Sequence, residues 1–267
     1  MELGLDGKVA LVTGASKGIG KAIAVELARE GCRVVLCARG EEDLEEAAEE
    51  AGRFGEALPV SADVTKADDA QRLISEAEGH FGPVEILVNN AGGIGHPAAF
   101  DELSDEEWFE VLDLNLISAV RLTRAVLPGM QEKGWGRVIN VASESGIQPD
   151  PFMPHYNASK AALINLTKSL SKAYGPEGIL INVVSPAFVM TPLVEGMLAE
   201  EAEERGISVE DAEAVFIEEN RPNIVVGRSG TSEETAAVVA FLASERASFV
   251  AGSNYRVDGG SVASTGS

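Results

Sequence analysis

The sequence predicts an α/β fold in which a doubly wound parallel sheet of about seven strands carries helices on both faces. Short apolar runs alternate with amphipathic helical segments along the whole chain, which is typical of βαβ units. Right-handed crossovers between such units place the helices on the two faces of one sheet. No linker or internal repeat divides the 267 residues, so we expect one domain over residues 1–267.

Hydrophobic periodicity and length define the expected elements. Apolar runs predict strands at residues 9–12, 33–38, 58–62, 84–89, 137–142, 180–184 and 254–258. Segments with a helical period predict helices at residues 18–29, 41–51, 67–78, 104–132, 157–174 and 232–243. One acidic insertion, residues 190–222, breaks this alternation and is expected to form short helices.

The charge balance is the unusual feature of the composition. Forty-three acidic residues against 21 basic residues give a net charge of -22 at pH 7. Such a protein repels phosphate backbones and anionic membranes, so we expect no nucleic-acid or membrane partner. Residues 41–50 hold seven acids and no base, and residues 195–219 hold ten acids and one base. Because the screening length is about 8 Å at physiological salt, cations elsewhere can still bind a small polyanion.

Other features predict a reduced, cytoplasmic protein. No run reaches the roughly 20 apolar residues of a membrane span, and the first residues lack the pattern of a secretory leader. Cys32 and Cys37 lie five residues apart in a segment expected to be a strand, so their side chains point to opposite faces and do not pair. Both are expected to be small core residues.

The turn between the first strand and the first helix, residues 13–20, is rich in glycine. It reads Thr-Gly-Ala-Ser-Lys-Gly-Ile-Gly. Glycines let the backbone approach a pyrophosphate, and the helix amino terminus offers unpaired N–H groups and a partial positive charge. The alternative is a tight turn that needs glycine only for its conformation. The turn predicts a dinucleotide site formed by Gly14, Ser16, Lys17, Gly18, Ile19 and Gly20.

Residues 14–18 also match Gly-x-Ser-x-Gly, the nucleophile turn of many serine hydrolases. A hydrolase needs oxyanion donors from an earlier strand loop, whereas Ser16 follows the first strand. The three histidines, His80, His96 and His155, do not lie in the late loop where the triad base is expected. A serine hydrolase is therefore a remote alternative.

The residues after the second expected strand indicate which dinucleotide binds. An NAD site usually carries Asp or Glu there, whereas this chain has Ala38 and Arg39. Arg39 and Lys17 can clamp a 2′-phosphate, which adds about 1.5 to 2 negative charges. NADP(H) is favoured over NAD(H), although the acids at residues 41–43 would weaken a phosphate that they faced.

A second group of motifs lies at the carboxyl edge of the expected sheet, where ligands of such sheets bind. Tyr156 and Lys160 share one helix face, and Ser143 follows the strand at 137–142. Together with the glycine turn, these residues belong to an ordered set of motifs that also includes Asp63-Val64, residues 89–92 (Asn-Asn-Ala-Gly) and Asn115. This set resembles the short-chain dehydrogenase/reductase family, and the resemblance runs from about residue 7 to residue 260.

The resemblance implies a Rossmann fold and an oxidoreductase that transfers a hydride between NAD(P)(H) and a carbonyl or secondary alcohol. It implies that Tyr156 exchanges a proton with the substrate oxygen and that Ser143 polarises this oxygen. Lys160 is expected to bind the nicotinamide ribose and activate Tyr156, and Asn115 to connect Lys160 to a chain of waters. The pKa of a tyrosine is near 10 and must fall by about 3 units for the side chain to exchange protons near neutral pH. One cation at roughly 4 Å supplies about that much, so we expect Lys160 alone to suffice.

Further cofactor contacts are implied by the same resemblance, in addition to those of Tyr156 and Lys160. They are Asp63, Val64, Asn90, Ala91 and Gly92 on the adenosine side, and Pro186, Val189 and Thr191 beside the nicotinamide. Asp63 can equally be a helix cap, and residues 89–90 a structural turn. The chain departs from the family at Ala187, where glycine is usual, and this extra methyl puts the cofactor pose in question. No cluster has metal-ligand spacing, so no metal is expected.

The acidic insertion at 190–222 is expected to act as a substrate lid. The expected pocket loops carry apolar Ile94, Ile147, Met153 and Phe188 and polar His96, Glu144 and Gln148. This mixture fits a small ketone, a sugar or polyol, or a 3-oxoacyl thioester. The insertion and Glu177, expected near the entrance, would repel an acidic carrier protein. A free small molecule is favoured, and a 3-oxoacyl-thioester reductase is the alternative.

Family resemblance also implies a homotetramer. Helices 104–132 and 157–174 would form one interface, and the last helix with the strand at 254–258 would form another. A cofactor-sensing regulator without catalysis is a further remote alternative, because Tyr156 and Lys160 are both present.

Overall fold

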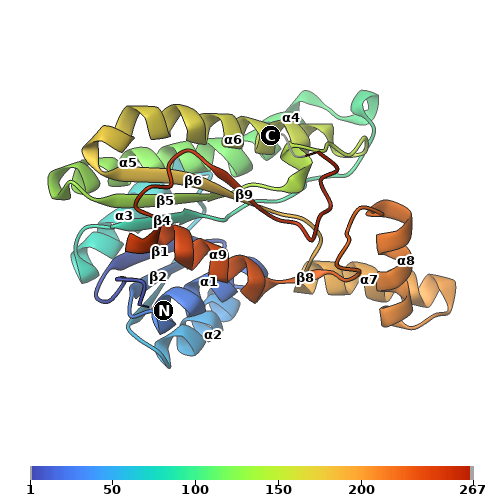
Figure 1. Cartoon of the computed structure of the whole chain (residues 1–267), viewed down its shortest axis with the longest axis horizontal. Helices are drawn as coiled ribbons and strands as arrows, with labels where there is room; N and C mark the ends of the chain where they lie inside the picture. The colour runs from blue at the N-terminus through green and yellow to red at the C-terminus, as the bar shows by residue number, and fades with distance from the viewer. Residues whose placement is uncertain (1, 265–267) are drawn as a thin grey trace.

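A computed structural model describes residues 2–264, and a parallel sheet forms its centre (Figure 1). The seven strands follow the order β3-β2-β1-β4-β5-β6-β9, which confirms the predicted doubly wound sheet. Their bounds are β1 (Val9–Thr13), β2 (Arg33–Ala38), β3 (Ala57–Ser61), β4 (Ile86–Asn89), β5 (Gly136–Val141), β6 (Ile179–Pro186) and β9 (Asn254–Val257).

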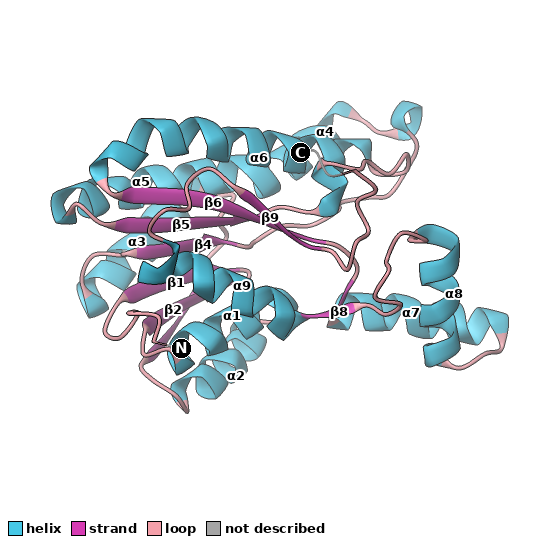
Figure 2. Ribbon diagram, viewed as in Figure 1, coloured by secondary structure: helices cyan, strands magenta, loops and turns pink. Residues whose placement is uncertain are grey.

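Helices cover both faces of the sheet, as Figure 2 shows. One face packs against α1 (Gly18–Arg29), α2 (Glu41–Gly52) and α9 (Ser232–Ala243). The other packs against α3 (Ala67–Phe81), α5 (Ser118–Lys133) and α6 (Pro154–Tyr174). Since every connection between neighbouring parallel strands crosses over, the two helical layers are a direct consequence of the strand and helix alternation.

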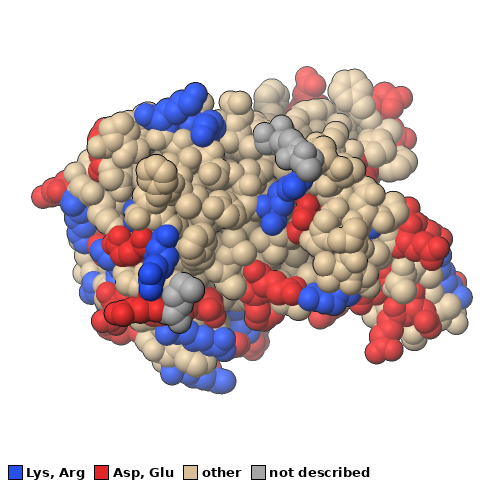
Figure 3. Space-filling model, viewed as in Figure 1, with Lys and Arg blue, Asp and Glu red and all other residues tan. Residues whose placement is uncertain are grey.

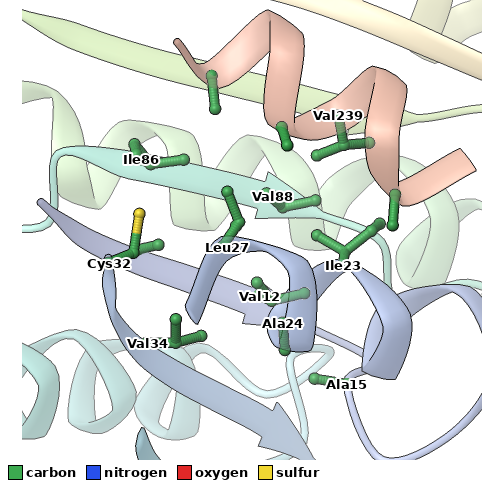
Figure 4. Close-up of a cluster of buried hydrophobic side chains, with 14 of the residues drawn as sticks. Val12, Ala15, Ile23, Ala24, Leu27, Cys32, Val34, Ile86, Val88 and Val239 are labelled. Atoms are coloured by element: carbon green, nitrogen blue, oxygen red, sulfur yellow. The ribbon is translucent and has the colours of Figure 1, made fainter. Parts of the chain in front are cut away.

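Alternate residues of each strand enter different cores, as the period of a strand requires. Val12 and Val34 lie in the core beneath α1, which Figure 4 shows, whereas Leu11 and Val35 lie in the opposite core. Cys32 belongs to the first core and Cys37 to the second, and neither forms a disulfide. Burial raises the pKa of both thiols to about 12, so both are unreactive at neutral pH.

The single helix expected at residues 104–132 is divided into two. It consists of α4 (Asp105–Leu112), a π-helical turn (Asp113–Ile117) and α5. The turn contains Asn115, whose buried carboxamide bonds to the backbone of Gly93. A π turn of this kind often marks a functional position, and periodicity alone does not reveal it.

The acidic insertion forms α7 (Pro192–Arg205) and α8 (Val209–Asn220), which confirms its predicted helical character. Two short strands, β7 (Val189–Met190) and β8 (Gly230–Thr231), pair in parallel where the insertion leaves and rejoins the body. Its own apolar cluster includes Leu198 and Ile217. The two helices stand beyond the carboxyl ends of the strands (Figure 1), and acidic side chains gather over them (Figure 3).

Short 3-10 turns complete the secondary structure: η1 (Phe100–Glu102), η3 (Glu144–Gly146), η4 (Gly175–Glu177) and η5 (Glu245–Ala247). Among the described residues, no helix is both long and apolar enough to cross a membrane.

Candidate active site

The glycine turn lies where the strand order reverses, between β1 and β4. A Cβ atom at Gly20 would lie 2.1 Å from the Gly14 carbonyl oxygen and 2.4 Å from Asn90 Nδ2. Asn90 Nδ2 donates hydrogen bonds to the carbonyls of Thr13 at 2.9 Å and Gly14 at 3.1 Å. These contacts make Gly20 a packing requirement, and they bring the predicted Gly14, Gly20 and Asn90 together.

The amino terminus of α1 is open to a ligand. Gly18 has a φ of +54°, which favours glycine, and no side chain in the described part of the chain caps this helix. Ser16, Lys17 and Ile19 complete the turn and are half-buried or exposed. A Cβ at Gly18 would lie 3.1 Å from Thr191 Cγ2, so the start of the acidic insertion adjoins the turn. The uncapped N–H groups match the chemistry of a bound pyrophosphate.

Lys17 and Arg39, the two predicted phosphate ligands, differ in their surroundings. Lys17 Nζ lies 2.8 Å from Asp43 Oδ2, and this partner raises the pKa of Lys17. Asp43, one of the acids at residues 41–43 that were expected to weaken a bound phosphate, therefore pairs with one of the two cations. Arg39 is exposed, and its guanidinium makes no hydrogen bond or ion pair within residues 2–264. Arg39 also lines a cavity of about 550 Å³.

Asp63 lines the same cavity, but its carboxylate forms hydrogen bonds with a neighbouring residue in the chain. Its Oδ1 accepts hydrogen bonds from Thr65 N at 3.0 Å and from Thr65 Oγ1 at 2.7 Å, and these bonds lower the pKa of Asp63. The side chain of Val64 is buried in the core. Asp63 thus closes a local turn with Thr65 and does not cap α3 (Ala67–Phe81), whose N-cap Lys66 has no side-chain cap bond among the described residues.

The predicted catalytic side chains converge at the carboxyl end of β5. Ser143 follows β5 and caps η3, while Tyr156 and Lys160 lie in the first two turns of α6. The Lys160 Nζ atom donates to the Val141 carbonyl at 2.9 Å and lies 5.7 Å from the centre of the Tyr156 ring. The helix spacing and the strand end therefore bring Ser143, Tyr156 and Lys160 to one place.

The electrostatics of this cluster differ from the simplest expectation. Burial raises the pKa of Tyr156, although a hydrogen bond with Ser143 opposes this. Burial also lowers the pKa of Lys160 to about 8. The expectation that Lys160 alone lowers the tyrosine pKa is therefore wrong, because removing both groups from water disfavours both charged forms.

Asn115 reaches the same site through Gly93. Its Oδ1 accepts from Gly93 N at 3.0 Å and its Nδ2 donates to Gly93 O at 2.9 Å. A Cβ at Gly92 would lie 2.7 Å from Asn115 Oδ1 and 3.1 Å from Lys160 Nζ. Gly92 is itself exposed, and Ala91 N donates to Thr13 Oγ1. A side chain at position 92 would therefore crowd both Asn115 and Lys160.

The residues expected beside the nicotinamide follow β6. Pro186 and Val189 are buried, and the half-buried Ala187 donates its N–H to the Val257 carbonyl at 3.2 Å. Thr191 Oγ1 accepts from Val194 N and so caps α7. These contacts hold the backbone at Ala187 and Thr191 in place.

Most of the polar residues expected in the pocket already have protein partners. His96 Nδ1 lies 2.9 Å from Glu107 Oε1. Gln148 bonds to the backbone of Ser261 and Ala263 and so holds the carboxyl-terminal segment against this loop. His155 is fully buried, and neither ring nitrogen has a hydrogen-bond partner in the described structure.

One prediction about the entrance is wrong. Glu177 lies in η4, directly before β6 begins at Ile179, and Gln131 donates to its carboxylate. It is therefore at the amino edge of the parallel sheet, opposite the catalytic cluster. Arg221 was not among the residues predicted for the site. It donates a hydrogen bond to Glu144, the residue after Ser143. No local pattern singles out this arginine, because its partner is 77 residues away.

These features define an α/β protein with a dinucleotide-type turn and a Ser-Tyr-Lys cluster at the same sheet edge. The arrangement does not support a serine hydrolase: none of the three histidines bonds to Ser16 within the described residues. The model of the family described as short chain dehydrogenase matches residues 8–202, and the chain belongs to this family.

Relatives and solved structures agree over nearly the whole chain. A D-beta-hydroxybutyrate dehydrogenase of Cupriavidus necator is 38% identical over 262 residues, which cover 97% of this chain and 99% of that protein. A 3-oxoacyl-[acyl-carrier-protein] reductase of Haemophilus influenzae is 36% identical, covering 96% of this chain and 98% of that protein. The structure of L-sorbose reductase from Gluconobacter frateurii, complexed with NADPH and L-sorbose, matches with a TM-score of 0.94 and 36% identity, covering 99% of this chain and 100% of that one.

The protein is accordingly an NAD(P)(H)-dependent oxidoreductase. It transfers a hydride between the nicotinamide and a carbonyl or secondary alcohol of a small molecule. Its Rossmann-type sheet and the resemblance to short-chain dehydrogenases and reductases are both confirmed.

Proposed function

We propose that the protein interconverts a ketone and a secondary alcohol on a free polar molecule of the sugar or polyol type, with NADP(H) as cofactor. The observation that carries this proposal is the convergence of Ser143, Tyr156 and Lys160 beside an uncapped glycine turn. We further propose that residues 1–267 act as one catalytic domain, with the acidic insertion at 190–222 as its substrate lid.

In this proposal the cofactor lies along the carboxyl edge of the sheet. The pyrophosphate binds at the residues of the turn, Gly14, Ser16, Lys17, Gly18, Ile19 and Gly20. The adenosine borders Asp63, Val64, Asn90, Ala91 and Gly92, and the nicotinamide end meets Tyr156, Lys160, Pro186, Val189 and Thr191. The positive φ of Gly18 and the amino terminus of α1, which no side chain caps among the described residues, support this fit.

The preference for NADP(H) rests on Arg39. Its guanidinium is exposed and has no partner in the described part of the chain, so it can form charge-assisted hydrogen bonds with a 2′-phosphate. Lys17 can join it only by leaving Asp43. The solved relative described with NADPH is consistent with this choice.

The chain's own residues handle the proton. Bound nicotinamide would supply or accept the hydride. In the reductive direction, Tyr156 donates the proton of its hydroxyl to the carbonyl oxygen, and Ser143 donates a hydrogen bond to the same oxygen. Lys160 holds the ribose side and stabilises the tyrosinate that remains. Asn115 connects Lys160 to solvent. Because burial raises the pKa of Tyr156, alcohol oxidation needs a positive charge near the tyrosine, and Lys160 is the cation of this chain that lies near its ring.

Two observations favour a free polar substrate over a carrier-bound one. The acids of α7 and α8 gather beyond the catalytic edge, where they would repel an acidic carrier protein (Figure 3). The L-sorbose reductase structure also matches over almost the full chain. The 3-oxoacyl-thioester reductase remains the second candidate, because the Haemophilus influenzae reductase is 36% identical.

A spectrophotometric screen tests the proposal. Sugars, polyols, small ketones and 3-oxoacyl thioesters would be assayed with NADPH and NADH in parallel. We expect turnover of a polar ketone with NADPH and a catalytic efficiency at least about tenfold lower with NADH. High activity on the carrier-bound thioester, unchanged by salt, would instead support the second candidate.

We also propose a cytoplasmic homotetramer. Exposed apolar side chains remain on α4, at Phe109, and between η5 and β9, at Phe249. The buried, unpaired cysteines suit a reducing compartment. Light scattering coupled to size exclusion would contradict the tetramer if it reported a single chain.

A further inference from the structure

A partly buried ion pair joins the acidic insertion to the loop that carries Ser143. Arg221, directly after α8, donates from Nε to Glu144 Oε1 at 2.8 Å. The Glu144 side chain is 6% exposed and that of Arg221 is 19% exposed. Such a pair is costly to break, since removing one partner leaves a charge away from water.

Arg221 is oriented by more than this one bond. Its Nη1 donates to the Asn220 carbonyl at 2.7 Å and lies 3.9 Å from Asp150 Oδ2. Glu144 and Asp150 bracket the loop between β5 and α6. The arginine thus fastens the end of the insertion to both sides of this loop.

Glu144 also lies close to the reacting groups. It follows Ser143 directly, and its turn, η3, packs on α6 so tightly that a Cβ at Gly146 would lie 2.9 Å from the Lys160 backbone carbon. Two charged groups among the described residues act on Tyr156. Lys160 lies near its ring, and the negative charge of Glu144 adds to the effect of burial in raising its pKa. Ser143 forms a hydrogen bond with the Tyr156 side chain. Glu144 Oε2 has no hydrogen-bond partner in the described structure, so Arg221 is the group that balances its charge.

We infer that Arg221 is a positioning residue: its ion pair with Glu144 docks the insertion on the catalytic loop and makes proton transfer at Tyr156 depend on that docking. This inference rests on the proposed role of Tyr156. A docked insertion neutralises the carboxylate beside the tyrosine, and an undocked one leaves it unbalanced. Two other contacts of the insertion are the stack of Phe188 on Phe216, at 4.5 Å between ring centres, and the hydrogen bond that Ser229 N donates to Glu213 Oε1 at 2.8 Å. Neither involves Glu144, so neither would have this effect.

The first experiment measures the pH dependence of kcat/KM for alcohol oxidation in the full-length protein. In Arg221→Gln, we expect the limb assigned to Tyr156 to move upward by about one pH unit, with a fall of roughly tenfold at neutral pH. Arg221→Lys should restore much of the shift because it keeps the charge. The double variant Arg221→Gln with Glu144→Gln should return the limb close to its original position.

A matched control is Arg205→Gln. This substitution removes one positive charge from the same insertion, but among residues 2–264 Arg205 pairs only with Glu201 and Glu219, which are also in the insertion. In Arg205→Gln we expect the limb of the pH profile assigned to Tyr156 to keep its position. A limb that is unmoved in Arg221→Gln, or one that moves equally in Arg205→Gln, would overturn the inference.

The second experiment needs no substrate. A glutamate-specific protease should cleave within residues 195–219 about tenfold faster in Arg221→Gln than in the unmodified protein, because an undocked segment opens more often. Cleavage at the unmodified rate would refute the docking role even if the protein proved inactive on every substrate. Failure of the unmodified protein in the substrate screen, with faster cleavage of the variant, would instead refute only the proposed function.

Discussion

The sheet with its cofactor edge and the acidic insertion hold their functional groups in different ways. At the edge, backbone and glycine contacts are so close that a single Cβ at Gly20 would overlap the Gly14 carbonyl. The insertion meets the rest of the chain through fewer anchors, chiefly the stack on Phe188, the hydrogen bond from Ser229 N to Glu213 and the ion pair of Arg221. A close-packed site admits little variation, whereas a segment held by a few side chains can be replaced or moved. We expect cofactor chemistry to reside in the first region and substrate choice in the second.

The most disruptive test of the rigid region is Tyr156→Phe. This change removes only the hydroxyl that we assign to proton transfer, and kcat should fall by about a thousandfold. Cofactor affinity should stay within about twofold, because the ring remains in place. Stopped-flow or steady-state assays with the substrate found by screening, together with NADPH fluorescence titration, would check both. Normal turnover would show that Tyr156 is not the proton donor.

Glycine-to-alanine changes compare the two regions directly. Gly20→Ala should lower the free energy of unfolding by about 2 to 3 kcal/mol and weaken cofactor binding, since the new methyl overlaps backbone. Gly196→Ala in α7 meets no atom within 4 Å and should be neutral or stabilising by up to about 1 kcal/mol. Urea unfolding measures both. Equal effects at the two positions would contradict the contrast between a packed edge and a loosely held insertion.

Lys160 tests how much the burial of a charged group lowers the free energy of unfolding. Its pKa falls from 10.5 to about 8 on burial, so the folded state binds fewer protons than the unfolded state between these values. The resulting penalty is complete below pH 8 and disappears as the pH rises above 10.5. Lys160→Met should therefore raise the free energy of unfolding at pH 7 by about 1 to 3 kcal/mol while abolishing activity. Urea titrations should show this gain shrinking between pH 8 and 10; a gain that grows with pH would contradict the assignment.

The smallest expected effect concerns the exposed rim of the cofactor edge. Arg39→Gln should weaken NADPH binding by about tenfold and leave NADH binding unchanged, because only a 2′-phosphate needs the guanidinium. Lys17→Gln is the comparison, and we expect a smaller loss since Lys17 is already paired with Asp43. Isothermal titration with both cofactors would measure the four affinities. Equal losses for NADH and NADPH would remove the argument for NADP(H).

Local and periodic signals explain what could be predicted. The alternation of apolar runs and helical segments predicted the parallel sheet, because periods of two and 3.6 residues survive in the sequence. The glycine turn and the spacing of Tyr156 and Lys160 placed most of the site, since such motifs are local. The division of the helix at Asp113–Ile117 could not be predicted, because the bonds of Asn115 to Gly93 cross 22 residues.

By itself, the sequence determined the fold class and the family, and it predicted candidate catalytic and cofactor residues, most of which lie along one sheet edge. Only the tertiary structure decided how the charges are matched: Lys17 with Asp43, Glu144 with Arg221, and Glu177 at the opposite edge from the one expected. It also decided that burial raises the pKa of Tyr156 and lowers that of Lys160. Motifs record the order of residues, whereas ion pairs and desolvation depend on which distant segments meet and on how much water they exclude.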